Sequence, residues 1–306
     1  MSVRLIWRTE FGEMLDRILL LGGEKGVLVS TGQKTHFLDE AGLQSWTVTL
    51  EGRAVGFGFS AHENVFFIAH ENGVRLVNRI GVTTKRVSLE SPPVGFVVSE
   101  IVAVLTEGEV LAFSREGREL WKSESGGSDL TSFRGRIFVG NGKKLAGFSR
   151  SGRKIAERDV PERIVALSAG KDSLLVALPH KILFMTEDCE TSDQKSLDDT
   201  VLGLSADEFI AVQYRSKVAL CDRNGEERWL LPIEASSVSS MGKGVAVAAG
   251  WDLLYYEEVG EKDVLYEVMC RGESRCGSFV SSSYLRRCPK CRSGRITTRI
   301  IKKEIY

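Results

Sequence analysis

A motif of about ten residues recurs along most of this 306-residue chain. Each copy has a short apolar run, a polar pair, a turn glycine, and an aromatic or small residue four positions later. An internal repeat constrains the fold more than any local pattern does, because each unit must bury its apolar face against its neighbours. The copies read FLDEAGLQSW at 37–46, AFSREGRELW at 112–121, GFSRSGRKIA at 147–156 and LCDRNGEERW at 220–229, with a divergent copy LVNRIGVTTK at 76–85.

The turn glycines measure the period of the repeat. They are Gly42, Gly81, Gly117, Gly152, Gly225 and Gly260, with spacings of 39, 36, 35, 73 and 35 residues. The spacing of 73 is two periods, and the missing copy falls in FMTEDCETSD at 184–193, where the turn has lost its glycine. A mean period close to 36 residues predicts seven units.

Inside each unit the hydrophobic pattern is that of strands. Runs such as NVFFIAHE, IVAVLTE and SLLVALP are short, rich in β-branched or aliphatic residues, and bounded by Gly, Asn, Ser or Asp. Each run is followed by a second strand, the glycine turn and a more polar strand, which makes about four strands per unit. Glycine suits the turn because tight hairpins need a positive φ, which a residue with a Cβ adopts only at a cost.

Seven four-stranded units of this length predict an all-β fold, a seven-bladed β-propeller in which each blade packs on its neighbours. A parallel β-solenoid should have a shorter period, and an array of β-sandwiches a larger unit. The N-terminal stretch RLIWRTE resembles the outer strand of a unit but lacks the strands that should precede it. We therefore expect it to complete the last blade, whose other strands come from about 235–258, because this removes an open sheet edge.

The repeats AFSREGRELW and LCDRNGEERW resemble those of the pyrroloquinoline-quinone-enzyme-like propellers and, more loosely, those of WD-repeat propellers. The resemblance covers residues 1–263. It implies that Trp46, Trp121 and Trp229 dock between adjacent blades, and Trp7 too if the ring closes as expected. The resemblance does not imply that this chain binds a quinone cofactor. The adjacent cysteine pair and the calcium-binding residues of those enzymes have no counterpart that we can place in this chain.

Four of the six cysteines lie together in CRGESRCGSFVSSSYLRRCPKC at 270–291. Two short-spaced pairs let two hairpin knuckles place four thiolates around one Zn²⁺. The second half, CPKCRSG, resembles a zinc-ribbon knuckle, whereas the first pair is separated by five residues instead of the usual two. We expect a zinc ribbon over residues 264–306; a redox dithiol at the last two cysteines is the alternative. The expected Zn²⁺ ligands are Cys270, Cys276, Cys288 and Cys291.

The remaining cysteines and the histidines favour packing over chemistry. Cys189 and Cys221 lie inside repeats, where we expect small buried side chains. The four histidines occupy non-equivalent repeat positions, which favours surface or packing roles. They are His36, His62, His70 and His180.

Charge is distributed unevenly along the chain. Residues 264–306 carry ten Lys or Arg and three Asp or Glu, whereas residues 1–263 carry 31 and 38. A basic surface with nearby aromatic residues can neutralise phosphates and stack bases, so we expect contact with RNA or DNA. A solvated face, or a surface that docks on the acidic propeller of the same chain, are the alternatives. The expected nucleic-acid-binding residues are Arg286, Arg287, Lys290, Arg292 and Arg295.

Motifs for catalysis are missing from the sequence. It has no G-x(4)-G-K-[ST], no H-E-x-x-H and no G-x-S-x-G. The expected innermost strands AVGFGFSA, VGFVVSE and VLGLSAD are mostly apolar and small. We expect a non-enzymatic scaffold that binds protein partners on the propeller faces and docks through its basic ribbon on nucleic acid or a ribonucleoprotein complex. The alternative is a hydrolase or oxidoreductase with its site at the propeller channel and the ribbon as a lid.

The expected location is the cytoplasm. No apolar run is long enough to span a bilayer, and charges interrupt the N-terminal segment where a signal peptide would be continuously apolar. Clustered thiols in a reducing compartment bind metal more often than they form disulfides, which agrees with the zinc interpretation.

Overall fold

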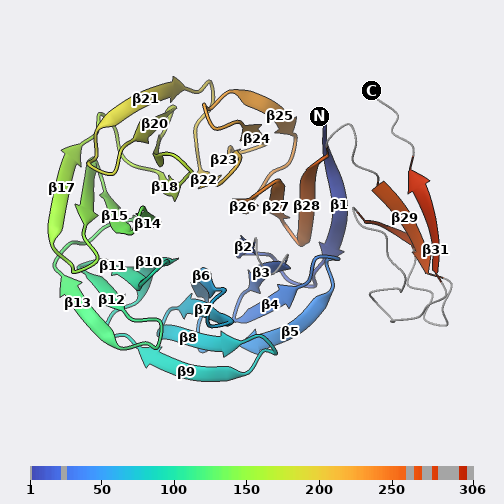
Figure 1. Ribbon diagram of the computed structural model, residues 1–306, viewed down its shortest axis with the longest axis horizontal. Helices are drawn as coiled ribbons and strands as arrows, with labels where there is room; N and C mark the ends of the chain where they lie inside the picture. Colours follow the sequence, from blue (N-terminus) through green and yellow to red (C-terminus); the bar gives the residue numbers. More distant parts are fainter. Residues whose placement is uncertain (1, 22–25, 260–264, 271–277, 282–295, 302–306) are drawn as a thin grey trace.

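A computed structural model describes residues 2–21, 26–259, 265–270, 278–281 and 296–301 of the chain. Seven four-stranded antiparallel sheets stand as blades around one axis (Figure 1). The predicted seven-bladed β-propeller is therefore confirmed. Within the described ranges there is no helix that is long and apolar enough to cross a membrane.

Each blade runs from an innermost first strand to an outermost fourth strand (Figure 1). Blade 1 has β2 (Arg17–Leu21), β3 (Gly26–Thr31), β4 (Lys34–Leu38) and β5 (Gln44–Thr49). Blade 2 has β6 (Ala54–Ser60), β7 (Val65–His70), β8 (Gly73–Asn78) and β9 (Thr83–Ser88). Blade 3 has β10 (Pro93–Val98), β11 (Val102–Thr106), β12 (Val110–Phe113) and β13 (Glu119–Ser123). Blade 4 has β14 (Asp129–Phe133), β15 (Arg136–Asn141), β16 (Lys144–Phe148) and β17 (Lys154–Asp159). Blade 5 has β18 (Ala166–Ala169), β19 (Leu174–Leu178), β20 (Lys181–Met185) and β21 (Thr191–Ser196). Blade 6 has β22 (Gly203–Ala206), β23 (Ile210–Gln213), β24 (Val218–Cys221) and β25 (Glu227–Leu231). Blade 7 has β26 (Ser237–Met241), β27 (Gly244–Ala249), β28 (Asp252–Val259) and β1 (Ser2–Glu10).

Blade 7 joins the two ends of the propeller. The N-terminal strand β1 pairs antiparallel with β28 along its whole length, from Ser2 opposite Val259 to Glu10 opposite Asp252. The Arg8 guanidinium closes the far end with two hydrogen bonds to the Asp252 carboxylate, at 2.7 and 2.8 Å. The closure expected from the sequence is thus confirmed. Because β1 pairs with β28, the edge of β28 is not left open.

Burial explains why the repeat alternates apolar and polar runs. The second and third strands of a blade are covered on both faces by neighbouring blades; in blade 3, β11 and β12 are buried at every position. Such strands are apolar without interruption. The outer strands meet solvent on one face, and β5 accordingly alternates exposed and buried residues over most of its length.

The turn between the third and fourth strands carries the repeat glycine. Gly152 has φ +81°, and a Cβ built there would lie 2.6 Å from a ring atom of Trp121, so both backbone and space require glycine. At the copy without glycine, Cys189 takes the same left-handed conformation with φ +61°. Gly260, the sixth glycine of the sequence pattern, lies outside the described residues.

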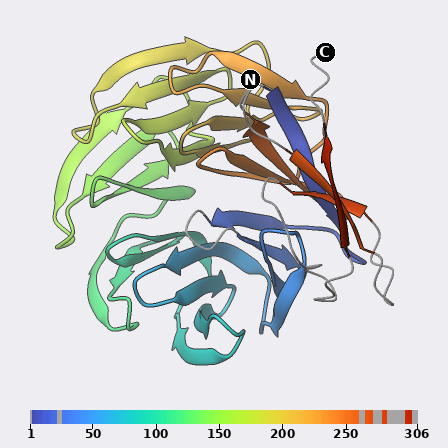
Figure 2. The same cartoon turned by 45° about the vertical axis from the view of Figure 1, so that its right-hand side comes forward.

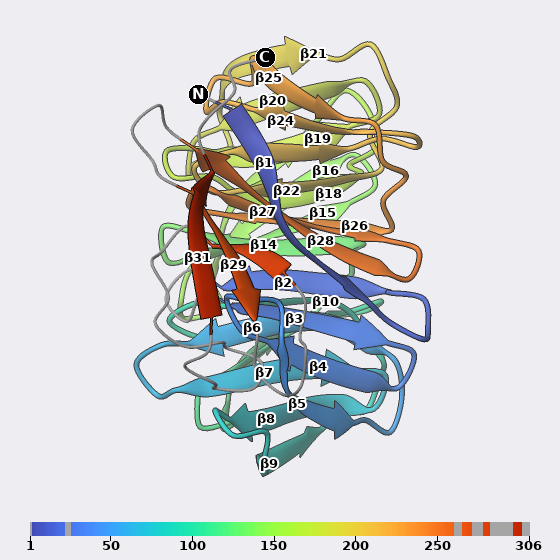
Figure 3. The same ribbon diagram turned by 90° about the vertical axis from the view of Figure 1, so that its right-hand side faces the viewer.

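A second, smaller sheet lies outside the ring. It consists of three antiparallel strands in the order β30-β29-β31, and β30 lies beside β1 of blade 7 (Figures 1, 2 and 3). The expected boundary between residues 263 and 264, and the zinc ribbon beyond it, stay predictions. The strands are β29 (Leu265–Cys270), β30 (Ser278–Ser281) and β31 (Ile296–Ile301).

Two tryptophans of blade 7 give a matched test of the ring closure. Trp7 is 8% exposed and packs at the seam with blade 1, whereas Trp251, in the turn before β28, is 60% exposed. We expect Trp7→Ala to lower the free energy of unfolding by about 3–5 kcal/mol, because it leaves a cavity at the closure. Trp251→Ala should change it by less than about 0.5 kcal/mol. Urea unfolding followed by far-UV circular dichroism measures both; equal effects would contradict the described closure.

Candidate functional site

The sequence-predicted site residues fall mostly outside the described part of the chain. Cys270 is the last residue of β29, opposite Ile296 of β31. The other three expected zinc ligands and the five expected nucleic-acid-binding residues lie outside the described residues, so both sets stay predictions. Those residues are Cys276, Cys288, Cys291, Arg286, Arg287, Lys290, Arg292 and Arg295.

The two cysteines inside the propeller are buried, as predicted. Cys189 is 1% and Cys221 2% exposed, and both are free thiols. Burial raises the pKa of Cys189 to about 11 and that of Cys221 to about 12. Both thiols are therefore protonated at neutral pH, which fits small packing groups rather than nucleophiles.

Two histidines of the propeller, His36 and His70, are buried, whereas His62 and His180 are exposed. His36 lines an open depression of about 500 Å³ between β1 and blade 1. Its Nε2 lies 3.2 Å from the Thr31 hydroxyl and its Nδ1 2.9 Å from both Gln44 and Thr47, so neither ring nitrogen is left for a ligand. Burial lowers its pKa. Within the described ranges, no three His, Cys, Asp or Glu side chains are grouped to hold a metal ion.

The innermost strands carry little that could catalyse a reaction. Across the seven described innermost strands, the ionisable residues are Arg17 at the start of β2 and Asp129 at the start of β14. A catalytic centre at the channel needs an acid, a base or a nucleophile that converge. The enzyme alternative therefore gains no support from these strands.

Polar side chains of the innermost strands bind neighbouring blades instead. The Ser168 hydroxyl accepts the backbone N–H of Ala206 in the next blade at 2.9 Å. In the same way Ser205 accepts the N–H of Ser240, and Ser239 that of Leu20 across the closure. These bonds fix four consecutive blades to one another and satisfy donors at the inner ends of the seams.

Asp129 extends this row of inter-blade bonds to blade 4. Its carboxylate accepts the N–H of Leu167 in blade 5 at 2.5 Å and that of Leu130 at 2.8 Å. Burial raises the pKa of this carboxyl to about 6, although both N–H groups favour the charged form. The group titrates near neutral pH, but its hydrogen bonds are structural.

One residue of the fourth strand stands at the outer part of each seam, and in four blades it is a tryptophan. Trp46 of blade 1 donates its indole N–H to the Arg79 carbonyl of blade 2 at 3.1 Å, and Trp121 of blade 3 donates to the Arg150 carbonyl at 2.8 Å. Trp7 donates in the same way to Glu40 across the closure. The accepting residue always stands two positions before the turn glycine or its equivalent. The predicted docking of these tryptophans between blades is thus confirmed.

Trp229 of blade 6 also packs at a seam, in a cluster with residues of blade 7. Its ring meets Phe209 edge to face at 5.5 Å. Its predicted packing role is likewise confirmed.

Two blades fill the same position without tryptophan. In blade 2 the residue is Lys85, whose ammonium group donates to the Glu116 carbonyl in the turn of blade 3. In blade 4 it is Ala156, and the buried Cys189 side chain enters the seam from the turn of blade 5. This position of the fourth strand can therefore hold a tryptophan, a lysine, or an alanine whose seam is completed by Cys189 of the next blade. In each of these cases the seam is closed.

Blade 5 is different, as the strand register shows. Phe184 of β20 stands opposite Asp193 of β21, just as Phe37 stands opposite Trp46 in blade 1. Phe37 stacks on Trp46 with ring centres 5.5 Å apart. Phe184 has the same place but faces an exposed carboxylate, and no ring among the described residues stacks on it.

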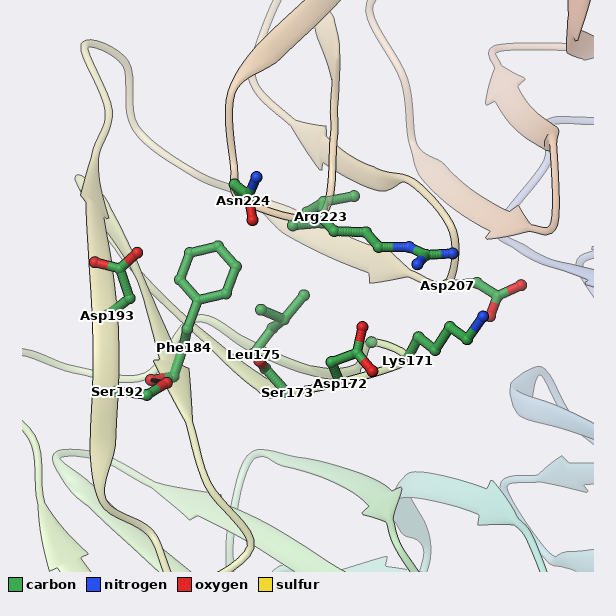
Figure 4. A pocket seen from close by; sticks show the side chains of 12 residues that line it. Lys171, Asp172, Ser173, Leu175, Phe184, Ser192, Asp193, Asp207, Arg223 and Asn224 are labelled. Atoms are coloured by element: carbon green, nitrogen blue, oxygen red, sulfur yellow. Dashed lines mark hydrogen bonds between the residues drawn. The ribbon is translucent and has the colours of Figure 1, made fainter.

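A pocket of about 190 Å³ opens at this seam between blades 5 and 6 (Figure 4). Leu175, Phe184 and Ile210 supply apolar lining and are themselves almost fully buried. Charged side chains surround this apolar lining: Lys171, Asp172, Asp193, Asp207 and Arg223 (Figure 4). Three carboxylates and two cations give the lining a net negative charge.

Ion pairs between the first hairpin of one blade and the glycine turn of the next bridge the three preceding seams. The seam of blades 5 and 6 has instead an ion pair between Lys195 of β21 and Glu226 of the blade 6 turn, at 2.5 Å. The first hairpin of one blade and the glycine turn of the next are joined by Glu63 and Arg115 at 3.4 Å, and by Glu100 and Arg150 at 2.5 Å. At the seam of blades 4 and 5 the signs are exchanged, in a pair between Arg134 and Glu187 at 3.1 Å.

The equivalent residues at the pocket are Asp172 and Arg223. Arg223 lies 4.0 Å from Glu208 of its own blade, and Asp172 makes no hydrogen bond or ion pair with any residue that the structure describes. The seam therefore lacks a docked tryptophan and the ion pair between first hairpin and glycine turn, while Lys195 lies against Gly225 and pairs with Glu226.

Comparison with known proteins identifies the architecture. No protein-family model matches the chain, and no curated protein matches it. Among solved structures it is similar to BamB from Moraxella catarrhalis, with 13% identity and a TM-score of 0.59 over 84% of this chain and all of that one. It is also similar to the Pan2 WD40 domain of Neurospora crassa, with 10% identity and a TM-score of 0.71 over 85% of this chain and 96% of that one. The chain is thus a seven-bladed β-propeller with BamB and WD40 structural neighbours; closer membership in the quinone-enzyme-like group stays a prediction.

The raised pKa of Asp129 predicts a pH dependence of stability. The folded protein holds this proton more tightly than the unfolded chain, whose carboxyl has a pKa near 3.8. The resulting stabilisation is present at acidic pH and is lost as the pH rises through 6. Between pH 4.5 and pH 7.5 the wild type should lose about 2 kcal/mol of unfolding free energy relative to Asp129→Asn. Urea titrations at both pH values measure this; an unchanged difference would contradict the assignment.

Proposed function

We propose that this protein is a non-enzymatic interaction scaffold whose propeller binds protein partners. The observation that carries the proposal is the inner surface, where the described strands present two ionisable residues and a row of structural serines. A rigid ring that exposes many loops suits recognition more than catalysis.

Exposed apolar side chains in the turns support partner binding. Ile80, in the turn of blade 2, is 76% exposed, and Met14, between β1 and β2, is 63% exposed. Trp251 is 60% exposed, and its carbonyl accepts the N–H of Phe11, so the turn before β28 and the segment after β1 lie together. Large exposed apolar side chains on ordered turns are typical anchors of protein interfaces.

The proposal includes a zinc ribbon at the C-terminal end. Cys270 ends β29, and the register places this end beside Ser278 of β30 and Ile296 of β31. In the sequence Cys276 precedes Ser278 by two residues and Cys291 precedes Ile296 by five, and these short spacings support one site shared with Cys270. Four thiolates would bind Zn²⁺ in a closed structural site, and the metal would supply folding free energy that a unit of about forty residues lacks.

The basic charge of the same unit supports docking on nucleic acid or a ribonucleoprotein complex. Ten basic residues in 264–306 against three acidic ones make this end strongly positive, and the propeller beside it carries the opposite net charge. Such a surface binds phosphates through counterion release, which makes the affinity depend strongly on salt.

Metal analysis tests the zinc site. Native mass spectrometry of the full chain should find one zinc per chain, and Cys291→Ser should lose it, because three thiolates hold the ion far less tightly. Cys189→Ala, which removes a buried propeller thiol, should keep it. Cys270→Ser tests the ligand with the unusual spacing. A wild-type chain that folds its C-terminal unit without metal would overturn the zinc ribbon.

Fluorescence anisotropy with single-stranded RNA and duplex DNA tests the nucleic-acid surface. Affinity should fall steeply between 50 and 200 mM salt, and the combined change Arg286→Ala, Arg287→Ala, Lys290→Ala should weaken it and reduce the salt slope by about two to three. The matched control replaces three exposed propeller residues, Arg118, Lys143 and Arg153, by Ala.

Affinity purification of the full chain, with and without nuclease, then separates the two parts of the proposal. Partners of the propeller should resist nuclease and survive the triple replacement. Absence of any specific partner would contradict the scaffold, whereas equal nucleic-acid binding by both triple variants would contradict only the basic surface.

A further inference from the structure

The pocket between blades 5 and 6 has the shape that tryptophan fills elsewhere in the ring. The registers place Asp193 where Trp46, Trp121 and Trp229 stand in their blades, directly after the bulged residue of the fourth strand. The turn of blade 6 retains its glycine, Gly225, with φ +78°. The glycine turn of a docking position is thus present, but the Phe184 ring and Lys195, rather than an indole, lie against its glycine.

Phe184 shows what kind of group would fit. Its counterparts in two other blades stack on the docked tryptophan: Phe37 on Trp46 at 5.5 Å, and Tyr255 on Trp7 at 5.3 Å, with ring planes within 30° in both cases. The Phe184 ring lies beside Gly225, where a Cβ would come within 3.1 Å of it. A planar group that enters the pocket therefore finds an aromatic face on which to stack.

The acceptor of the docked N–H is also in place. In the filled seams the indole donates to the carbonyl two residues before the turn glycine, as Trp46 does to Arg79. The corresponding carbonyl at the pocket is that of Arg223, which takes no part in the regular strand pairing of β24 and β25. In blade 2 the ammonium group of Lys85 donates to the neighbouring carbonyl, that of Glu116 one residue before Gly117, so a cationic donor is compatible with this turn.

The charge of the pocket selects a cation. Asp193 and Asp172 make no ion pair with the residues that the structure describes, while the third carboxylate, Asp207, accepts the backbone N–H of Gly242 at 2.6 Å. Of the two cations, Arg223 has Glu208 at 4.0 Å, and Lys171 makes no ion pair with the described residues, so one unpaired cation stands against two unpaired carboxylates. Two carboxylates are left above an apolar floor, and the ion pairs of the other seams place an arginine against such a carboxylate.

We propose that this pocket binds an arginine side chain of a protein partner. The guanidinium is planar like the indole, carries N–H donors for the Arg223 carbonyl, and pairs with Asp193 and Asp172. Its aliphatic stem packs on Leu175 and its face stacks on Phe184. The partner's arginine thereby takes the place of the tryptophan and of the hairpin-to-turn ion pair that other seams have.

This inference rests on the proposed scaffold function only in that a partner supplies the arginine. The pocket itself can be tested without any partner. A small blocked amino acid is a sufficient probe, so failure of the pocket and failure of the scaffold give different results.

The test is a titration of the full chain with N-acetyl-arginine methylamide, followed by methyl NMR signals of Leu175 and Ile210. We expect saturable shifts with a dissociation constant in the millimolar range. Asp193→Asn keeps the space but removes a charge and should weaken binding about two- to fivefold. Asp193→Trp should fill the position and abolish the shifts. Glu107→Gln, an exposed carboxylate in blade 3, is the matched control and should change nothing.

Two further probes make the specificity falsifiable. N-acetyl-glutamate methylamide should produce no saturable shift, and N-acetyl-tryptophan methylamide should bind more weakly than the arginine probe because it leaves the carboxylates unpaired. No saturation with the arginine probe, tighter binding of either other probe, or unchanged binding by Asp193→Trp would overturn the proposal. If Asp193→Trp does not fold, Asp172→Asn together with Asp193→Asn carries the same test, and unaltered affinity in that double variant would overturn it.

Discussion

The contact on which this ring depends is the docking of one outer-strand side chain against the glycine turn of the next blade. Trp46, Trp121 and Trp7 make it with the same hydrogen bond, from the indole N–H to a carbonyl two residues before the turn glycine. The contact needs a glycine because the indole occupies the space of a Cβ. This contact joins blades that follow one another in the sequence, and through Trp7 it joins the last blade to the first. One local contact, repeated around the axis, thus helps to close the ring.

The seams have an inner and an outer half that are held by different forces. On the inside, Ser168, Ser205 and Ser239 accept backbone N–H groups of the following blade. Blades 2 and 3 instead meet through close apolar packing, since a Cβ at Gly58 would lie 2.2 Å from Val98. In both arrangements the side chains of the inner strands hold neighbouring blades together. The surfaces that remain for partner binding are the turns and the outer openings of the seams.

Much of this architecture can be predicted from the repeat alone. The glycine spacing predicts the number of blades, and the orphan strand RLIWRTE predicts the closure, because both are consequences of strand pairing and of the φ that a tight turn requires. Apart from Cys270, the residues on which the zinc and nucleic-acid predictions rest lie outside the described part of the chain, so these predictions stand on spacing and charge alone.

The pocket could not be predicted in the same way. The aligned motifs already differ at one place, where FMTEDCETSD ends in Asp193 and LCDRNGEERW in Trp229. A substitution at a packing position can be compensated by a neighbour, as Cys189 does for Ala156. Only the register and the side-chain packing show that Phe184 and Lys195 cover Gly225 and that a pocket stays open beside Phe184 and Asp193.

A crystal structure of the Asp193→Trp variant tests most directly whether one repeated contact holds the ring and is absent between blades 5 and 6. The account predicts that the introduced indole lies on Phe184 and donates its N–H to the Arg223 carbonyl, as Trp46 does to Arg79. An introduced indole that points into solvent and leaves the pocket open would contradict it.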